Sequence, residues 1–193
     1  MEKKTKSIVA VVVSIAVVLI AAAVIVAVFV TQTKRQPQNP NDTHVFGVKE
    51  GREKLIENGE SDYAILIPSD ADTFTSYAAE EMQFFIEEAT GITLPVVTDA
   101  AASENGAYLS IGDTSLFEKS GISLDKSILK GNGYYIRSSG DDVFIVGGDG
   151  RGNTNGVYTF LKYQFGYEYF ADGAYSLERN VRDKPLMDFD VKD

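Results

Sequence analysis

The chain has 193 residues, with 18 lysines and arginines against 28 aspartates and glutamates, which gives a formal net charge of −10. A chain this acidic repels nucleic acid and anionic lipid headgroups, so nucleic-acid binding is excluded as its function. The absence of cysteine excludes disulfides, thiol catalysis and thiolate metal sites, so the hydrophobic core must hold any ordered domain together.

The first element in chain order is an uncharged run of 24 residues, 7–30, in which Ser7 and Ser14 are the only polar side chains. A helix of this length measures about 36 Å and can cross a hydrocarbon core of about 30 Å. We therefore expect a transmembrane signal anchor that contacts the lipid bilayer through residues 7–30. A cleaved signal peptide is the alternative, but its apolar region spans only about 7–15 residues and ends in small residues.

Positive charge before this run sets its expected orientation. Three lysines and the amino terminus precede it, against the single acid Glu2. Residues 1–6 are therefore expected to be a cytoplasmic tail. Residues 31–193 hold 15 basic and 27 acidic side chains, a net charge of −12. We expect a single-pass protein of the cell membrane whose acidic carboxy-terminal domain is extracellular.

The rest of the chain divides by composition into three parts. Residues 31–61 are expected to be a linker or stalk, because they begin with a polar stretch containing two prolines. Within them, 44–58 is ambiguous, with a short helix as one option. Residues 62–175 are long enough for one hydrophobic core. Residues 176–193 are expected to be a carboxy-terminal extension, because their last part has few apolar anchors.

Hydrophobic periodicity within 62–175 predicts the element order β-α-β-β-β-β-α-β. The first helix has its apolar residues at three-four spacing from Phe74 to Ala89, and Gly91 is placed to end it. Pro95 favours an edge position for the strand that follows. The expected fold class is α+β: one mixed β-sheet with two amphipathic helices packed on one face, preceded by a transmembrane helix. The expected strands are 63–67, 92–98, 107–111, 134–138, 143–146 and 167–170, and the second helix is 155–165.

A glycine-rich run, 147–156, follows a strand and opens the second helix. It has no lysine for a phosphate-binding loop, lacks the third glycine of a dinucleotide fingerprint, and has the wrong residues for a calcium loop. Two interpretations stay open. The run is either a tight turn whose glycines let the backbone enter the helix, or a loop that contacts a sugar or a partner.

Paired acids at 80–81, 87–88 and 141–142 are candidates for glycosidase chemistry, but their predicted positions are a polar helix face and a hairpin turn. His44 is the only histidine and lies in or beside the linker, which argues against a Ser-His-Asp site or a histidine metal site. We therefore expect no catalytic residue, no metal and no cofactor in this chain.

Tyrosine is the main aromatic residue, with ten copies and no tryptophan. Four tyrosines gather around the second helix and its exit: Tyr158, Tyr163, Tyr167 and Tyr169. Such a group is either core and rim packing or an aromatic platform of the kind that binds sugars.

The segments 151–161 (RGNTNGVYTFL) and 165–173 (FGYEYFADG) together resemble the signature of an accessory domain. This domain precedes the catalytic barrel in alpha-glucuronidases (glycoside hydrolase family 67) and in beta-N-acetylhexosaminidases. It also occurs in large bacterial surface proteins of uncharacterised function. Tyr169 stands where the family often has tryptophan.

Three further segments support the resemblance, which covers roughly 62–173: AAEEMQFF at 78–85, GITLPV at 91–96 and AYLSIG at 107–112. The resemblance implies a mixed sheet with two helices on one face. It also implies a structural role beside a (β/α) barrel rather than catalysis. A barrel needs about 250 residues, so no catalytic residue is carried over.

The leading hypothesis is a membrane-anchored extracellular accessory domain of glycoside-hydrolase type, non-catalytic by itself and associated with carbohydrate processing. Its expected partners are carbohydrate or a glycosidase barrel, in cis or in trans. One alternative is a stand-alone glycan-binding module, and another is a protein-interaction module at the cell surface. The candidate binding residues are Arg151, Asn153, Asn155, Tyr158 and Tyr169.

Overall fold

The structure, a computed structural model, describes residues 45–149 and 151–193. Within these residues, no helix is long and apolar enough to cross a membrane. The expected anchor at 7–30, the tail before it and the first part of the expected linker lie outside the described residues.

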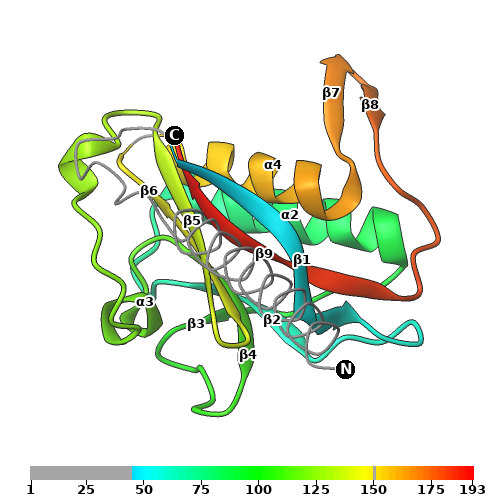
Figure 1. The fold of residues 1–193 in the computed structure, drawn as a ribbon, viewed down its shortest axis with the longest axis horizontal. Coiled ribbons are helices and arrows are strands. Elements are labelled where there is room, and N and C mark those ends of the chain that lie inside the picture. The colour runs from blue at the N-terminus through cyan, green and yellow to red at the C-terminus, as the bar shows by residue number, and fades with distance from the viewer. Residues whose placement is uncertain (1–44, 150) are drawn as a thin grey trace, which may run out of the picture. The chain divides into compact units, whose positions relative to one another are not determined.

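The described residues form a mixed seven-stranded sheet with the order β1-β9-β5-β6-β4-β2-β3 (Figure 1). Strands β3, β2, β4 and β6 run parallel to one another, whereas β5, β9 and β1 pair antiparallel. The strands are β1 (Val45–Ile56), β2 (Tyr63–Ile67), β3 (Val96–Thr98), β4 (Ala107–Ile111), β5 (Tyr134–Ser139), β6 (Asp142–Gly147) and β9 (Lys184–Lys192).

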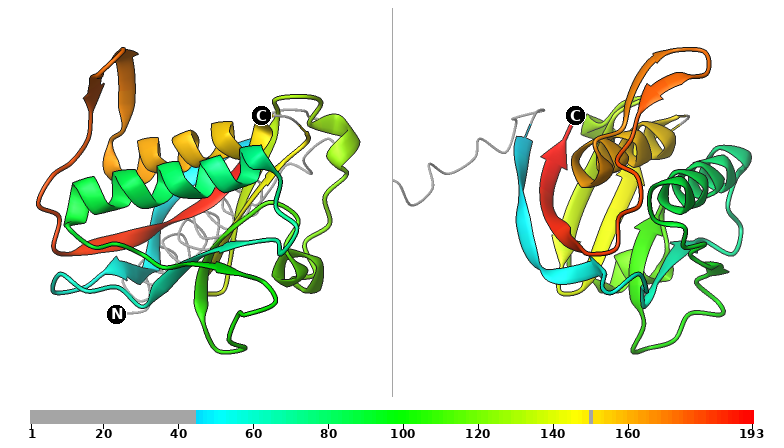
Figure 2. Two further views of the ribbon diagram at one scale, coloured as in Figure 1. Left: turned by 180° about the vertical axis from the view of Figure 1, so that it is seen from behind. Right: turned by 90° about the vertical axis from the view of Figure 1, so that its right-hand side faces the viewer.

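Two long helices, α2 (Thr73–Thr90) and α4 (Gly152–Phe165), lie side by side on the same face of this sheet (Figure 2). Met82 and Ile86 of α2 and Phe160 of α4 are fully buried, and they belong to one core with sheet residues such as Ile145. The expected α+β fold with a mixed sheet and two helices on one face is therefore confirmed.

Short elements complete the described fold. A short helix, α3 (Ser115–Lys119), and a single 3-10 turn, η1 (Lys126–Ile128), lie between β4 and β5. After α4, the strands β7 (Glu168–Ala171) and β8 (Ala174–Ser176) pair as a separate hairpin. The strand expected at 167–170 therefore exists, but it does not join the main sheet. The expected strand at 92–98 is reduced to β3, and β3 does lie at the edge of the sheet, as Pro95 indicated.

The largest difference from the sequence analysis concerns β1 and β9. Residues 45–56 were expected within a linker and 184–192 within an extension, yet they pair with each other as strands of the main sheet. Leu55 and Ile56 of β1 are fully buried, and Phe189 of β9 is 1% exposed. The linker interpretation is wrong for 45–56, and the extension interpretation is wrong for 184–192.

Strand β9 is also fastened to helix α4 by a buried side chain. Gln164 donates from its Nε2 to the carbonyl oxygen of Pro185 (2.8 Å) and accepts at its Oε1 from the backbone nitrogen of Met187 (2.9 Å). These two bonds satisfy both ends of an amide that is fully buried. The last strand is thus part of the domain's interior rather than a frayed end.

The opening of α2 gives a testable prediction. Asp72 caps the helix by accepting from the backbone nitrogen of Thr75 (2.7 Å), and this bond holds the pKa of Asp72 below its ordinary value of 3.8. We expect Asp72→Ala to lower the free energy of unfolding by about 0.5–2 kcal/mol at neutral pH. The measurement is denaturant unfolding at a series of pH values.

The sign of the pH dependence follows from the lowered pKa. The contribution of Asp72 is full above pH 3.8 and is lost as the pH falls through its lower folded-state value. Asp72→Asn is the matched control, because the amide oxygen can still accept the bond but cannot be protonated in this range. Equal acid sensitivity of Asp72→Asn and the unchanged chain would contradict the assignment.

Candidate functional site

The glycine-rich run, expected between a strand and a helix, packs backbone against backbone at the start of α4. A Cβ added to Gly152 would lie 2.4 Å from the carbonyl oxygen of Gly133 and 2.7 Å from the Cα of Gly147. One added to Gly156 would lie 2.6 Å from the Cγ2 of Ile145. The helix therefore approaches β5 and β6 more closely than any side chain would allow. This geometry favours the tight-turn interpretation of the run.

Asn153 is engaged inside this packing. Its Oδ1 accepts from the backbone nitrogen of Gly147 (2.7 Å), and its Nδ2 donates to the Oγ1 of Thr75 (2.9 Å). The side chain thereby ties the end of β6 to the first turn of α2. It also lines a polar hollow at the carboxyl ends of the parallel strands, where Lys126 pairs with Asp113.

A second hollow lies on the other side of the α4 amino terminus, and we call it the tyrosine hollow. Its volume is about 560 Å³. It brings together residues from the segment before β5, from β5 itself and from α4. The lining includes Lys130, Asn132, Tyr134, Asn155, Tyr158 and Thr159.

Hydrogen bonds fix several side chains of the tyrosine hollow. The Nδ2 of Asn155 donates to the carbonyl oxygen of Asn132 (3.0 Å), and the Oγ1 of Thr159 donates to the hydroxyl of Tyr134 (2.9 Å). The Tyr134 hydroxyl in turn donates toward Asp193 (3.5 Å). Burial is the main cause that raises the pKa of Tyr134, so its hydroxyl stays neutral at physiological pH.

Tyr158 links the hollow to a group of rings that we call the aromatic cluster. The cluster joins α2, α4 and the β7–β8 hairpin, and consists of Phe84, Phe85, Tyr158, Tyr167 and Tyr175. The rings of Tyr158 and Tyr167 stack with centroids 5.5 Å apart and an interplanar angle of 13°. Phe85 and Tyr167 are buried at its base, whereas Phe84 is 51% exposed.

Acidic side chains of α2 bind the tyrosine hydroxyls of this cluster. Tyr158 donates to Glu81 (2.6 Å), and burial together with this carboxylate raises the pKa of Tyr158. Tyr175 donates to Glu88, and Arg179 pairs with the same carboxylate at 2.9 Å. The hydrogen bond from Tyr175, followed by that from Arg179, lowers the pKa of Glu88. In each acid pair of α2, one carboxylate therefore binds a tyrosine hydroxyl of the aromatic cluster. These carboxylates are Glu81 in the first pair and Glu88 in the second.

The five candidate binding residues do not meet at one place. Asn155 and Tyr158 line the tyrosine hollow, and Asn153 lines the polar hollow at the strand ends. Arg151 is exposed at the position that precedes α4. Tyr169 lies on β7, 57% exposed, with its hydroxyl bonded to Asp172 (2.7 Å).

The sequence analysis missed the other half of the tyrosine hollow. Lys130, Asn132 and Tyr134 come before and within β5, 20 or more residues before Asn155 in the chain. The spacing of residues gives no signal for such a neighbourhood, because it depends on β5 lying under the start of α4. Of the four tyrosines expected to gather, only Tyr158 and Tyr167 belong to the aromatic cluster. Tyr169 lies on β7 outside it, and Tyr163 contacts Phe46 instead, with ring centroids 5.1 Å apart.

Within residues 45–149 and 151–193, no group of three or more histidine, cysteine, aspartate or glutamate side chains is arranged to hold a metal ion. The acids near the strand ends line the polar hollow together with a lysine. One of them, Asp72, caps α2. The tyrosine hollow offers hydrogen-bonding groups and tyrosine rings.

No protein-family model matches the chain, and no curated protein matches it. Among solved structures, the GH20 beta-N-acetylhexosaminidase from Streptomyces coelicolor A3(2) gives a TM-score of 0.46 at 16% identity, covering 82% of this chain and 27% of that chain. The structure of CpGH84D gives a TM-score of 0.46 at 13% identity, and the match covers 80% of this chain and 24% of that chain. Streptomyces plicatus beta-hexosaminidase gives a TM-score of 0.43 at 17% identity, and the match covers 80% of this chain and 26% of that chain.

This chain thus spans about a quarter of the length of these enzymes. At TM-scores below 0.5 and identities below 20%, the similarity is too low to assign an activity or a substrate to it.

Proposed function

We propose that this protein is an extracellular accessory domain of glycoside-hydrolase type, anchored in the cell membrane by residues 7–30, that holds a carbohydrate-processing barrel at the cell surface. In this role the domain does not itself break glycosidic bonds. The barrel is a partner in cis or in trans. The proposal rests on the sequence resemblance over 62–173 and on one structural observation, the exposure of aromatic side chains on α2 and on the β7–β8 hairpin.

The segments that carry the resemblance become α4 and the β7–β8 hairpin, and their aromatic side chains are not all used in the core. Tyr169 and Phe170 of the hairpin are 57% and 65% exposed, and Phe84 of α2 is 51% exposed. Exposed aromatic side chains are typical of surfaces that bind another protein. The hairpin forms its own two-stranded sheet and does not pair with the main sheet.

The acids beside the exposed rings give the surface a defined chemistry. Glu80 and Glu87 are exposed on α2, and Glu168 and Asp172 are exposed on the hairpin. A partner surface with apolar pockets and basic side chains at its rim would complement such a face. A catalytic barrel that docks here would be expected to carry lysine or arginine at the matching positions.

Site-specific photocrosslinking in native cells tests the proposal. A photo-reactive phenylalanine derivative at position 84 should crosslink to the catalytic domain of a glycoside hydrolase, identified by mass spectrometry of the joined peptides. Phe46 is a matched control, because it is 64% exposed but contacts Tyr163 at the β1 edge instead of the cluster. A product from position 84 that contains no glycoside hydrolase, or equal yields from both positions, would overturn the docking role.

The membrane location needs its own measurement. Protease added to intact cells should degrade residues 45–193 while leaving the anchor in the membrane fraction, if the carboxy-terminal part is outside. Protection of this part in intact cells, followed by digestion after lysis, would contradict the proposed orientation.

A further inference from the structure

We infer that the tyrosine hollow is a binding site for one sugar ring of a neutral oligosaccharide. This inference deepens the proposed function, on whose carbohydrate context it rests, because it names a ligand class and its position on the domain. It involves a different surface from the exposed rings at which a partner barrel would dock.

The hollow combines the two kinds of group that a sugar ring requires. Tyr134 and Tyr158 supply ring surface for the apolar C–H face of a sugar. The volume of about 560 Å³ falls within the roughly 300–1,000 Å³ typical of small-molecule sites. Both rings are held in place, Tyr134 through Thr159 and Tyr158 through Glu81 and its stack on Tyr167. A rigid ring surface costs little entropy on binding.

Polar atoms for the sugar hydroxyls are available at the rim. Asn155 is oriented by the bond from its Nδ2 to Asn132, and within the described residues its Oδ1 accepts no hydrogen bond. That oxygen can accept from a sugar hydroxyl. Lys130 is exposed and forms no ion pair within the described part of the chain, so its ammonium group can donate to another hydroxyl. An oriented acceptor and a donor that line the same hollow can bind different hydroxyls of a pyranose ring.

Charge indicates which saccharides fit. Among the described residues that line the hollow, one has a cationic side chain, Lys130, and one has an acidic side chain, Asp193, so these side chains contribute little net charge. Residues 31–193 carry a net charge of −12, which repels polyanionic glycans. A neutral oligosaccharide avoids this repulsion and needs no counter-charge in the hollow.

Isothermal titration calorimetry on the full chain tests the inference, in a detergent whose headgroup is not a sugar. The probes are two neutral trisaccharides, cellotriose and triacetylchitotriose, and one anionic trisaccharide, trigalacturonic acid. We expect at least one neutral probe to bind with a dissociation constant of about 1 mM, and the anionic probe to bind more weakly at low salt. Absence of heat from both neutral probes at tens of millimolar would overturn the inference.

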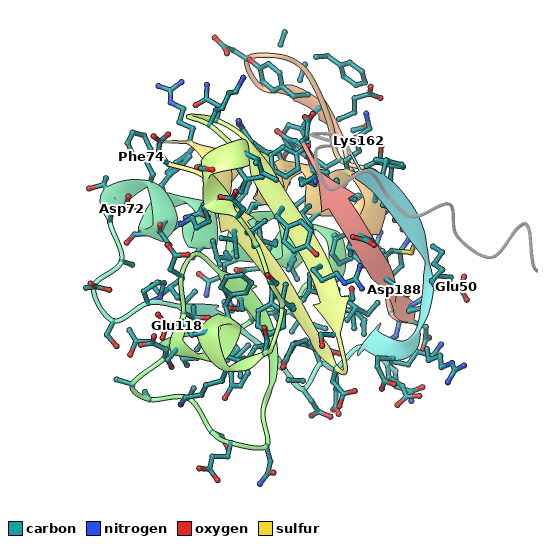
Figure 3. All side chains as sticks on the ribbon, turned by 60° about the vertical axis from the view of Figure 1, so that its left-hand side comes forward. Glu50, Asp72, Phe74, Glu118, Lys162 and Asp188 are labelled. Carbon is teal, nitrogen blue, oxygen red and sulfur yellow. The ribbon has the colours of Figure 1, made fainter. Side chains whose placement is uncertain are left out.

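Variants place the binding in the hollow. Asn155→Ala removes the acceptor, and Lys130→Gly removes the donor while suiting a backbone that already has a φ of 52°. Each should weaken binding about fivefold, the value of one hydrogen bond. Lys162→Ala is the matched control on the same helix, exposed and outside the hollow, and should leave binding unchanged (Figure 3).

The outcomes separate this inference from the proposed function. Binding that Lys162→Ala weakens as much as Lys130→Gly does would place the ligand elsewhere and contradict the inference. Phe84→Ala should leave the titration unchanged, because Phe84 does not line the hollow. Crosslinking from position 84 without sugar binding would support the docking role and contradict sugar binding in the tyrosine hollow. Sugar binding in the hollow without crosslinking from position 84 would support this inference and contradict the docking role.

Discussion

Replacing Phe189 by alanine is expected to lower the free energy of unfolding by about 3–5 kcal/mol. The side chain is 1% exposed in β9, and its ring centroid lies 5.4 Å from that of Phe160 in α4. Alanine would leave a cavity between the sheet and the helix layer, where the neighbours on both sides are held by their own elements. Chemical denaturation of the chain in detergent, followed by near-ultraviolet circular dichroism of its tyrosines, measures the loss.

Phe170→Ala is the control for this prediction, because Phe170 is 65% exposed on the β7–β8 hairpin. Its removal should change the free energy of unfolding by no more than about 0.5 kcal/mol. A Phe189→Ala variant as stable as Phe170→Ala would mean that β9 does not contribute to the core. The comparison therefore tests whether the last strand belongs to the domain.

The two strands that were expected to be a linker and an extension are rich in charged residues, and only β1 lies at the edge of the sheet. Strand β1 carries alternating charges over 49–54, and such charges protect a sheet edge from pairing with another chain. From Asp188 to Lys192, strand β9 alternates polar and apolar residues, and two of its acids form ion pairs with the neighbouring strands, Asp188 with Lys49 and Asp190 with Arg137. Local composition predicts that these segments are exposed to solvent. The long-range pairing of β1 with β9 makes them strands of the sheet instead.

The middle part of the chain was predictable because its signals are local. The expected apolar face of α2 is buried from Ala78 to Ala89, but Phe74 and Tyr77, which the spacing placed on that face, are 43% and 45% exposed. Gly91 ends the helix in the left-handed conformation, as expected. The hairpin at Gly140 joins β5 and β6 as expected. These features depend on periodicity and turn chemistry within a short window.

Only half of the candidate site was predictable, because its other half depends on contacts between segments that are far apart in the sequence. Asn155 and Tyr158 stand one turn apart on a helix, so sequence reasoning could place them together. Lys130, Asn132 and Tyr134 reach them only because β5 lies in the sheet beneath the start of α4. That neighbourhood depends on the close packing of the glycines between the helix and the sheet.

Gly152→Ala tests this close packing. For this variant, helix propensity and packing predict opposite changes in the free energy of unfolding. Alanine at the first residue of α4 should favour the helix by up to about 1 kcal/mol relative to glycine. The added Cβ, however, would lie 2.4 Å from the Gly133 carbonyl oxygen and 2.7 Å from the Gly147 Cα, both of them backbone atoms. Backbone neighbours cannot rotate away as a side chain can. We therefore expect a net loss of about 3 kcal/mol in the free energy of unfolding, the upper end of typical overpacking costs.

Gly47→Ala in β1 provides the comparison, since its added Cβ would lie at an ordinary 3.5 Å from the Asp190 carbonyl oxygen. It should change the free energy of unfolding by about 0.5 kcal/mol or less. If Gly152→Ala is no worse than Gly47→Ala, the glycines are not required for packing, and the loop that they form would be free to serve a ligand. If the loss is large, the glycines are needed to bring α4 against β5, and the tyrosine hollow should be lost with them. Titration of the same variant with the neutral trisaccharides would then show no binding, although Asn155 and Tyr158 are unchanged.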